Sequence, residues 1–181
     1  MIDTIKKYYL NVIVRDLINK FEYRTLTKIP KIKKIILNFG DYQMGLKELA
    51  SALLALELIT NQKGFLTISS KSNVMLKIRK GSPVGCSVIL TGDSMYSFIF
   101  KLTFEVFPSL KDFSPIKVSK KLKVDSFSFS LKDLTGFKEL SKQFYFFSML
   151  PPLNVVCLTN TSTKAELTYL LKSFKFPLSQ L

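Results

Sequence analysis

The chain has 181 residues, enough for one domain with a proper hydrophobic core, and 27 Lys and Arg against 13 Asp and Glu give it a formal net charge of +14. A field of this size predicts a polyanionic partner, either nucleic acid or an anionic membrane surface. Histidine is absent and the two cysteines, Cys86 and Cys157, lie far apart, which excludes zinc-ribbon spacing, Cys–His nucleophiles and Ser–His–Asp triads.

The first half of the chain predicts a helix, a strand, a second helix and then several short strands. Residues 3–20 carry apolar residues at helical spacing opposite lysine and arginine, which predicts an amphipathic helix. The run KIKKIILNFG, residues 31–40, predicts a strand with a basic entrance, and residues 46–60 return to helical periodicity. Three β-type runs with turn residues between them follow and predict neighbouring antiparallel strands: 65–69, 74–78 and 84–91.

The second half predicts two more helices and two more strands. Asp93 looks like the N-cap of a helix that Pro108 ends. The polar and strongly basic residues 114–125 predict a loop or excursion, after which SFSFSL predicts a half-exposed strand. The run LNVVCLT predicts a buried strand, and Thr163 with Glu166 forms a capping-box pattern before the last helix.

These elements predict an α+β fold: one domain over residues 1–181, with an antiparallel sheet and helices packed mainly on one face. Within it we expect a basic loop at about 70–82 and a divergent excursion at about 114–126. No uninterrupted apolar stretch reaches about 18 residues, so we expect no membrane span. Both cysteines lie in apolar runs and are expected to be small buried hydrophobic residues.

The stretch KIRKGSPVGC, residues 77–86, places a dense cationic patch just before a Gly- and Pro-rich turn. Such a patch can be an ordinary solvated face beside a tight turn. It can also be a basic loop at a sheet edge that neutralises RNA phosphates through Lys71, Lys77, Arg79 and Lys80. Nearby Asn38, Asn61 and Gln62 are either ordinary turn residues or hydrogen-bonding partners of ribose and base edges.

The sequence offers no support for catalysis. The pattern GxxxxGK is absent, no GxGxxG follows a predicted strand, and the acidic residues are scattered without an obvious acid/base pair. We therefore expect no enzyme activity, no metal and no cofactor.

Several motifs occur in the order and spacing of one known family. They are KIPKIKKIILNFG, LLALELITNQK, KIRKGSPVGCSVIL, FPSLKDF, SFSFSLKDLTGFKEL and NVVCLTNTSTKAELTYLLKSFKFP. Together they resemble large-subunit ribosomal protein five, the 5S-rRNA-binding protein of bacterial and organellar ribosomes. The resemblance covers roughly Tyr9 to Pro177.

The resemblance implies a ferredoxin-like fold and a structural, 5S-rRNA-binding role in the central protuberance of the large ribosomal subunit. It further implies contacts with large-subunit rRNA, the elbow of the P-site tRNA, neighbouring central-protuberance proteins and, through an inter-subunit bridge, a head protein of the small subunit. The implied 5S rRNA contacts are Asn38, Gln62, Lys63, Thr67 and Ser69. The implied contacts of the basic loop with large rRNA and tRNA are Lys71, Ser72, Lys77, Arg79 and Lys80.

We also expect general phosphate contacts from the lysines at the basic strand entrance, Lys28, Lys31 and Lys33. The chain departs from the usual family pattern at Thr91, where an arginine is common, and at Met75, where the loop normally carries glycine. The aromatic run before the last strand resembles mitochondrial versions, and a start without a presequence fits synthesis inside the organelle. We therefore expect a mitochondrial, organelle-encoded ribosomal protein, with the plastid as the second choice.

A different function class stays open at this point. The helix at residues 3–20 could serve a basic polyanion- or membrane-binding adaptor, in which Ile5, Val12 and Ile13 would contact the membrane. If the same residues pack inside the domain instead, making them polar should unfold it.

Overall fold

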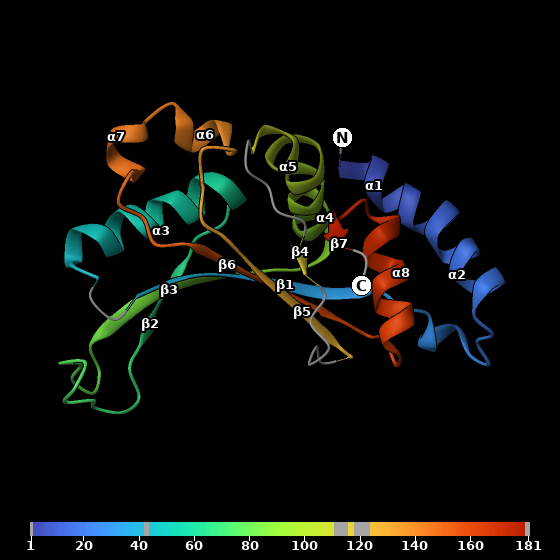
Figure 1. Ribbon diagram of the computed structural model, residues 1–181, viewed down its shortest axis with the longest axis horizontal. Helices are drawn as coiled ribbons and strands as arrows, with labels where there is room; N and C mark the ends of the chain where they lie inside the picture. Colours follow the sequence, from blue (N-terminus) through green and yellow to red (C-terminus); the bar gives the residue numbers. More distant parts are fainter. Residues whose placement is uncertain (1, 42–43, 111–115, 118–123, 180–181) are drawn as a thin grey trace. The chain divides into compact units, whose positions relative to one another are not determined.

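The computed structural model describes residues 2–41, 44–110, 116–117 and 124–179 (Figure 1). The chain forms two compact units, and each is described by itself. Unit 1 comprises Met1–Ile35, Leu90–Phe129 and Val156–Leu181, and unit 2 comprises Ile36–Ile89 and Ser130–Val155.

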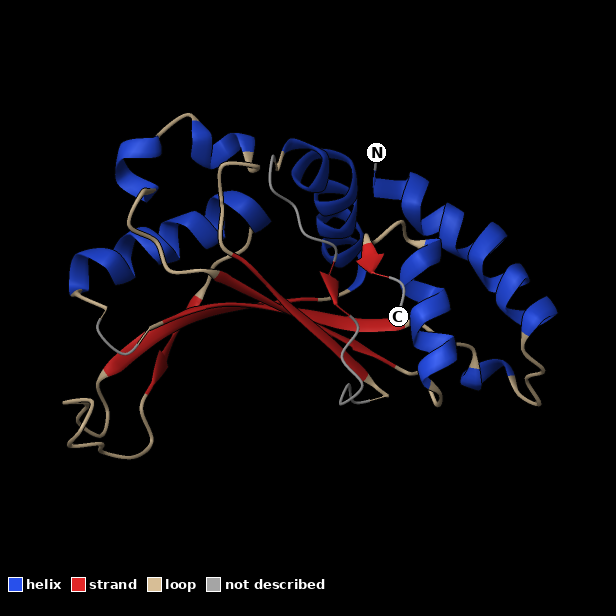
Figure 2. Cartoon of the chain, in the orientation of Figure 1, coloured by secondary structure: helices blue, strands red, loops and turns tan. Residues whose placement is uncertain are grey.

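A five-stranded antiparallel sheet is the central element, with the strand order β2-β3-β1-β6-β5. Its strands are β1 (Ile32–Gly40), β2 (Phe65–Ile68), β3 (Pro83–Leu90), β5 (Ser126–Leu131) and β6 (Leu153–Thr159). In each unit the helices lie on one face of that unit's strands (Figure 2). The predicted α+β class is confirmed. We propose, as the sequence predicts, that residues 1–181 fold as one domain, because β1, β3, β5 and β6 each have residues in both units.

The N-terminal helix of unit 1 contains a π-helical turn. It comprises α1 (Ile2–Tyr8), η1 (Tyr9–Ile13) and α2 (Val14–Lys20). Its buried residues recur every four positions, at Ile5, Tyr9, Ile13 and Leu17. Four residues advance an α-helix by more than one turn, so the stripe would drift around the helix. The wider π turn offsets that drift and keeps the stripe facing the core.

The burial of Ile5 and Ile13 bears on the adaptor alternative, which needs the apolar face of this helix to be accessible. Ile13 is fully buried and Ile5 is 7% exposed, whereas Val12 is 40% exposed. The apolar face is therefore part of the unit 1 core, which does not support the adaptor. No helix in the described part of the chain is both long and apolar enough to span a membrane.

The second long helix of unit 1 differs from the prediction at both ends. It comprises α4 (Gly92–Lys101), the π-helical turn η3 (Leu102–Val106) and α5 (Phe107–Ser109). Thr91, not Asp93, is the N-cap, and Asp93 instead forms an exposed 2.7 Å salt bridge with Lys6 of α1. Pro108 does not end the helix, because it lies in the first turn of α5, where a missing N–H costs no helical hydrogen bond.

The C-terminal part of unit 1 follows the prediction closely. The helix α8 (Lys164–Ser173) begins with the predicted capping box, in which the N–H of Glu166 donates to Thr163 Oγ1 at 3.3 Å. The Glu166 carboxylate accepts from the N–H of Thr163 in return. Within the predicted excursion, β4 (Ile116–Lys117) pairs in parallel with β7 (Leu178–Ser179), and 124–126 form a turn and the first residue of β5. The rest of residues 114–126 lies outside the described residues.

Unit 2 is built on α3 (Leu46–Thr60), which has the predicted bounds. Glu48 accepts a hydrogen bond from the N–H of Gly45 at its start, and Asn61 ends it in the left-handed region with φ 55°. Two short helices that the sequence did not predict, α6 (Lys138–Ser141) and α7 (Phe144–Phe147), pack against α3. The predicted strand at 74–78 is wrong, because Val74 to Lys77 form a turn.

Strands β1 and β3 approach closely at Gly85. A Cβ at this position would lie 2.4 Å from the carbonyl oxygen of Phe39 and 3.1 Å from the Cα of Gly40. Both are backbone atoms, which cannot move aside without shifting β1. Glycine at position 85 is therefore a condition for the pairing of these two strands.

We predict that Gly85→Ala lowers the free energy of unfolding by about 1–3 kcal/mol, the usual cost of overpacking. Gly40→Ala is the control, because a Cβ there meets its nearest neighbours at 3.5 Å, an ordinary contact. That control should stay within about 0.5 kcal/mol of the wild type. Urea denaturation measures both, and equal stability of the two variants would contradict the steric argument.

Both cysteines are free, fully buried and carry pKa values raised by desolvation, to about 11 for Cys86 and about 12 for Cys157. The thiol is neutral when protonated, so a raised pKa in the folded state stabilises the fold below the unfolded value of 9.0. This stabilisation is lost as the pH rises from 9 toward the folded value.

We predict that the Cys157 thiol alone makes the free energy of unfolding fall by about 1 kcal/mol between pH 9 and pH 10. Denaturant titrations of the wild type and of Cys157→Ala over this range measure the difference. The variant should show the smaller fall, whatever its stability at pH 7. Identical pH dependence of the two proteins would rule out titration of Cys157.

Candidate nucleic-acid interface

The strands of unit 2 have one face that the helices do not cover. Leu37 and Phe39 of β1 are fully buried, so the alternating Asn38 points to the opposite face and is half-buried. Ser87 contacts Asn38 on that face, and Phe65 is the direct cross-strand partner of Ser87. We call this surface the open face of unit 2; it comprises Ile36, Asn38, Phe65, Thr67, Ser87 and Ile89.

The Asn38 carboxamide is held by its neighbours on β1 and β3. One of its terminal atoms lies 2.9 Å from the carbonyl oxygen of Cys86, 3.0 Å from Ser87 Oγ and 3.3 Å from the carbonyl oxygen of Phe39. Carbonyl oxygens only accept hydrogen bonds, so the atom that faces them is the amide nitrogen. Asn38 therefore donates to its own sheet through nitrogen.

The turn after α3 positions the next two predicted residues. The N–H of Gln62 donates to Thr60 Oγ1 at 3.3 Å, which holds the turn against the end of the helix. Lys63 is exposed and precedes Gly64, where a Cβ would come within 2.8 Å of the Leu53 side chain. Gly64 thus keeps the turn close to α3, and Gln62 and Lys63 stand at the start of β2.

Residues 69–82 form a protruding hairpin between β2 and β3, which we call the basic arm (Figure 1). At its base the N–H of Ser69 donates to Ser82 O at 2.9 Å, and that of Gly81 to Ser69 O at 2.8 Å. Near its tip Asn73 and Ile78 exchange backbone hydrogen bonds of 2.9 and 3.0 Å. The arm is therefore a hydrogen-bonded structure at both ends.

The tip of the arm is the turn at Val74–Lys77, and its geometry explains why the β-type pattern there was misleading. Asn73 Oδ1 accepts from the N–H groups of Met75 and Leu76 at 3.1 and 3.3 Å, an Asx turn. Lys77 adopts a left-handed φ of 55°. Val74 and Met75 are 91% and 95% exposed, so apolar residues typical of strands here cover nothing.

The cations of the arm have no compensating charge nearby. Lys71, Lys77, Arg79 and Lys80 are all exposed, and within the described residues none of them forms a salt bridge. Mutual repulsion among four such charges is reduced when a polyanion binds, with release of its counterions. The arm therefore has the electrostatic character of a phosphate-binding element.

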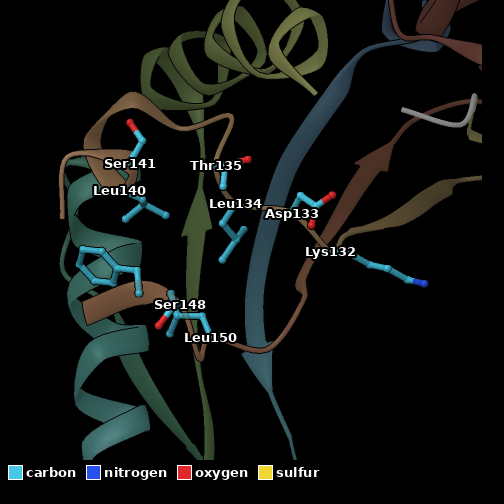
Figure 3. Close-up of a pocket in the computed structure, with 9 residues that line it drawn as sticks. Lys132, Asp133, Leu134, Thr135, Leu140, Ser141, Ser148 and Leu150 are labelled. Carbon is cyan, nitrogen blue, oxygen red and sulfur yellow. The ribbon is translucent and has the colours of Figure 1, made fainter. Parts of the chain in front are cut away.

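A hollow of about 270 Å³ in unit 2 offers a different kind of site (Figure 3). Leu134, Leu140 and Leu150 are among its lining residues, and Lys132 extends away from them in the view shown. Histidine and cysteine are absent from its lining, and no group of metal-ligating residues occurs among the described residues. The hollow offers no recognisable chemistry.

Comparison with known proteins identifies the family. A model of the C-terminus of the ribosomal uL5 family matches residues 83–178, more than half of the chain. Large ribosomal subunit protein uL5m of Reclinomonas americana is 38% identical over 178 residues, which cover 97% of this chain and 98% of that protein. The chain belongs to the ribosomal uL5 family.

Two further relatives extend the comparison. Large ribosomal subunit protein uL5 of Nitrosomonas eutropha is 35% identical over 94% of this chain and 95% of its own length. Large ribosomal subunit protein uL5c of Pleurastrum terricola is 33% identical over 97% and 95%. The family consists of structural proteins of the large ribosomal subunit and not of enzymes, in agreement with the sequence prediction.

In this uL5-family chain the predicted site residues fall into two groups. Asn38, Thr67 and Ser69 lie along the open face and the base of the arm, with Gln62 and Lys63 at the start of β2; all belong to unit 2 together with the arm. The exposed Lys28, Lys31 and Lys33 belong to unit 1, so they form a separate cationic group. Thr91, where the family commonly has arginine, is exposed and serves as the N-cap of α4.

Sequence reasoning missed two residues of this candidate site. Ser87 is only 6% exposed and contacts Asn38 from the neighbouring strand, and Gly40 lies beside the Asn38 carboxamide. A signal existed for Ser87, since it is the polar residue within the apolar strand run VGCSVIL. No signal marked Gly40, because its role depends on which atoms face it.

Proposed function

We propose that the chain is the 5S-rRNA-binding protein of an organellar large ribosomal subunit and anchors 5S rRNA to the large rRNA in the central protuberance. The observation that carries this proposal is the combination, within unit 2, of a neutral hydrogen-bonding sheet face and an arm of uncompensated cations. Such a pair can contact base and ribose edges with one part and phosphates with the other. Membership of the uL5 family supports the same interpretation.

The roles divide by residue. Asn38, Gln62, Lys63, Thr67 and Ser69 contact 5S rRNA; Lys71, Ser72, Lys77, Arg79 and Lys80 contact large rRNA and the P-site tRNA elbow. Lys28, Lys31 and Lys33 add phosphate contacts from unit 1. The same protein bridges to a head protein of the small subunit and meets other proteins of the central protuberance.

The relatives support an organellar ribosome, since one is named as a mitochondrial uL5m and another as a chloroplast uL5c. We propose the mitochondrion. The support is the 38% identity to the Reclinomonas protein over nearly the whole length of both chains.

The first test is specific binding of purified full-length protein to 5S rRNA, measured by filter binding at several salt concentrations. We expect binding to 5S rRNA to be at least about tenfold tighter than to an unrelated hairpin of similar length. Asn38→Ala should weaken the 5S complex by about three- to tenfold, the range of one lost hydrogen bond. Ser51→Ala on α3, which removes a bond to the Glu48 carbonyl away from the open face, is the control. Equal affinity for both RNAs would contradict 5S recognition.

The second test concerns the arm. The triple variant Lys77→Ala, Arg79→Ala, Lys80→Ala should impair assembly of the protein–5S complex onto large subunits that lack this protein. Its salt slope in that assay should fall by about 2 to 3, one phosphate contact for each lost cation.

A variant with the same change in net charge, Lys7→Ala, Lys47→Ala, Lys172→Ala, is the control, since all three lysines are exposed and outside the arm. Co-sedimentation with large subunits is the readout. Equal loss in both triple variants would show that only net charge matters and would contradict a specific role of the arm.

A further inference from the structure

We propose that Ser87 and Gly40 turn Asn38 into a directed hydrogen-bond acceptor: Ser87 fixes the carboxamide, Gly40 leaves its oxygen accessible, and the oxygen accepts from a ribose 2′-hydroxyl or a base amino group. This inference rests on the proposed function, because it concerns the RNA that the open face binds.

The orientation of the carboxamide follows from its neighbours. The nitrogen is surrounded by the carbonyl oxygens of Cys86 and Phe39 and by Ser87 Oγ, at 2.9 to 3.3 Å. Rotating the amide by 180° would place its oxygen against two carbonyl oxygens and lose these bonds. The protein therefore uses the nitrogen for its own sheet and leaves the oxygen for a ligand.

Ser87 contributes the one side-chain anchor among these three contacts. It is 6% exposed, so its hydroxyl is largely shielded from water and needs a partner within the protein. At 3.0 Å from the Asn38 amide it supplies that partner and restricts rotation of the side chain. Ser87 is a positioning residue, since it acts on RNA through Asn38.

Gly40 governs access to the other end of the carboxamide. A Cβ at position 40 would lie 3.5 and 3.9 Å from the two terminal atoms, and in the orientation that satisfies the nitrogen the nearer atom is the oxygen. A methyl group there would fill the space that a ligand atom needs. The distances are ordinary contacts, so the methyl group obstructs the oxygen without disturbing the strand.

The ligand chemistry follows from charge and polarity. All members of the open face, Ile36, Asn38, Phe65, Thr67, Ser87 and Ile89, are uncharged. A carbonyl-type oxygen repels phosphate oxygens, which also only accept. The partner is therefore a donor on RNA, and Phe65, 49% exposed and directly opposite Ser87, provides an aromatic surface beside it.

Analogue interference on 5S rRNA tests this inference with the full chain. One RNA pool carries random phosphorothioate-tagged 2′-deoxynucleotides, and a second carries tagged inosine, which lacks the amino group of guanine. Bound and unbound RNA are separated and read by iodine cleavage. With wild-type protein we expect interference at one position or more, and the pool that shows it identifies the source as ribose or base.

The same maps are then made with Ser87→Ala and Gly40→Ala. We expect each variant to bind 5S rRNA about three- to tenfold more weakly and to lose a wild-type interference position. Ser51→Ala and Gly45→Ala are the matched controls, because Ser51 lies on α3 and a Cβ on Gly45 has nothing within 4 Å. Both controls should keep the wild-type map.

The outcomes separate this inference from the proposed function. If the wild type does not bind 5S rRNA specifically, the proposed function is wrong. If it binds, but both variants keep the complete wild-type map, the inference alone is overturned. Thermal unfolding confirms that either variant is folded, so that a lost position reflects the carboxamide and not the fold.

Discussion

The close pairing of β1 with β3 at Gly85 is the constraint on which the candidate interface depends. Because position 85 has no side chain, the Phe39 carbonyl approaches to a distance that a Cβ would forbid. That approach fixes the register that brings Ser87 to Asn38, with Phe65 opposite Ser87 on the next strand. The same strand leads back from the basic arm, so one pairing sets the position of both parts of the interface within unit 2.

Local patterns predicted the elements whose formation depends on local physics. The bounds of α3, β1 and β6 and the Thr163–Glu166 capping box followed from periodicity and from short-range hydrogen bonds. The turn at Val74–Lys77 did not, because strand propensity there competes with an Asx turn at Asn73 and a left-handed Lys77. The π-helical turns were also missed, although the four-residue spacing of Ile5, Tyr9, Ile13 and Leu17 exceeds the α-helical period.

The site shows the same division. Exposed cations such as Lys71 and Arg79 can be found from sequence, because a charge outside the core is visible as a charge. The relation between Ser87 and Asn38 spans 49 positions and depends on strand register and on which end of an amide faces two carbonyl groups. Neither quantity is encoded in a local pattern. Family resemblance located Asn38, and only three-dimensional geometry indicated what its oxygen is free to do.

A neutral face beside a cationic arm separates specificity from attraction. Phosphate contacts of Lys77, Arg79 and Lys80 weaken steeply as salt rises, because releasing counterions into a concentrated solution gains less entropy. A hydrogen bond from an RNA donor to the uncharged Asn38 carboxamide has no such dependence. Raising the salt therefore removes attraction for any polyanion faster than it removes recognition of the correct one. The ratio of specific to non-specific affinity should accordingly be set by the open face, and the arm should set how fast RNA of either kind arrives.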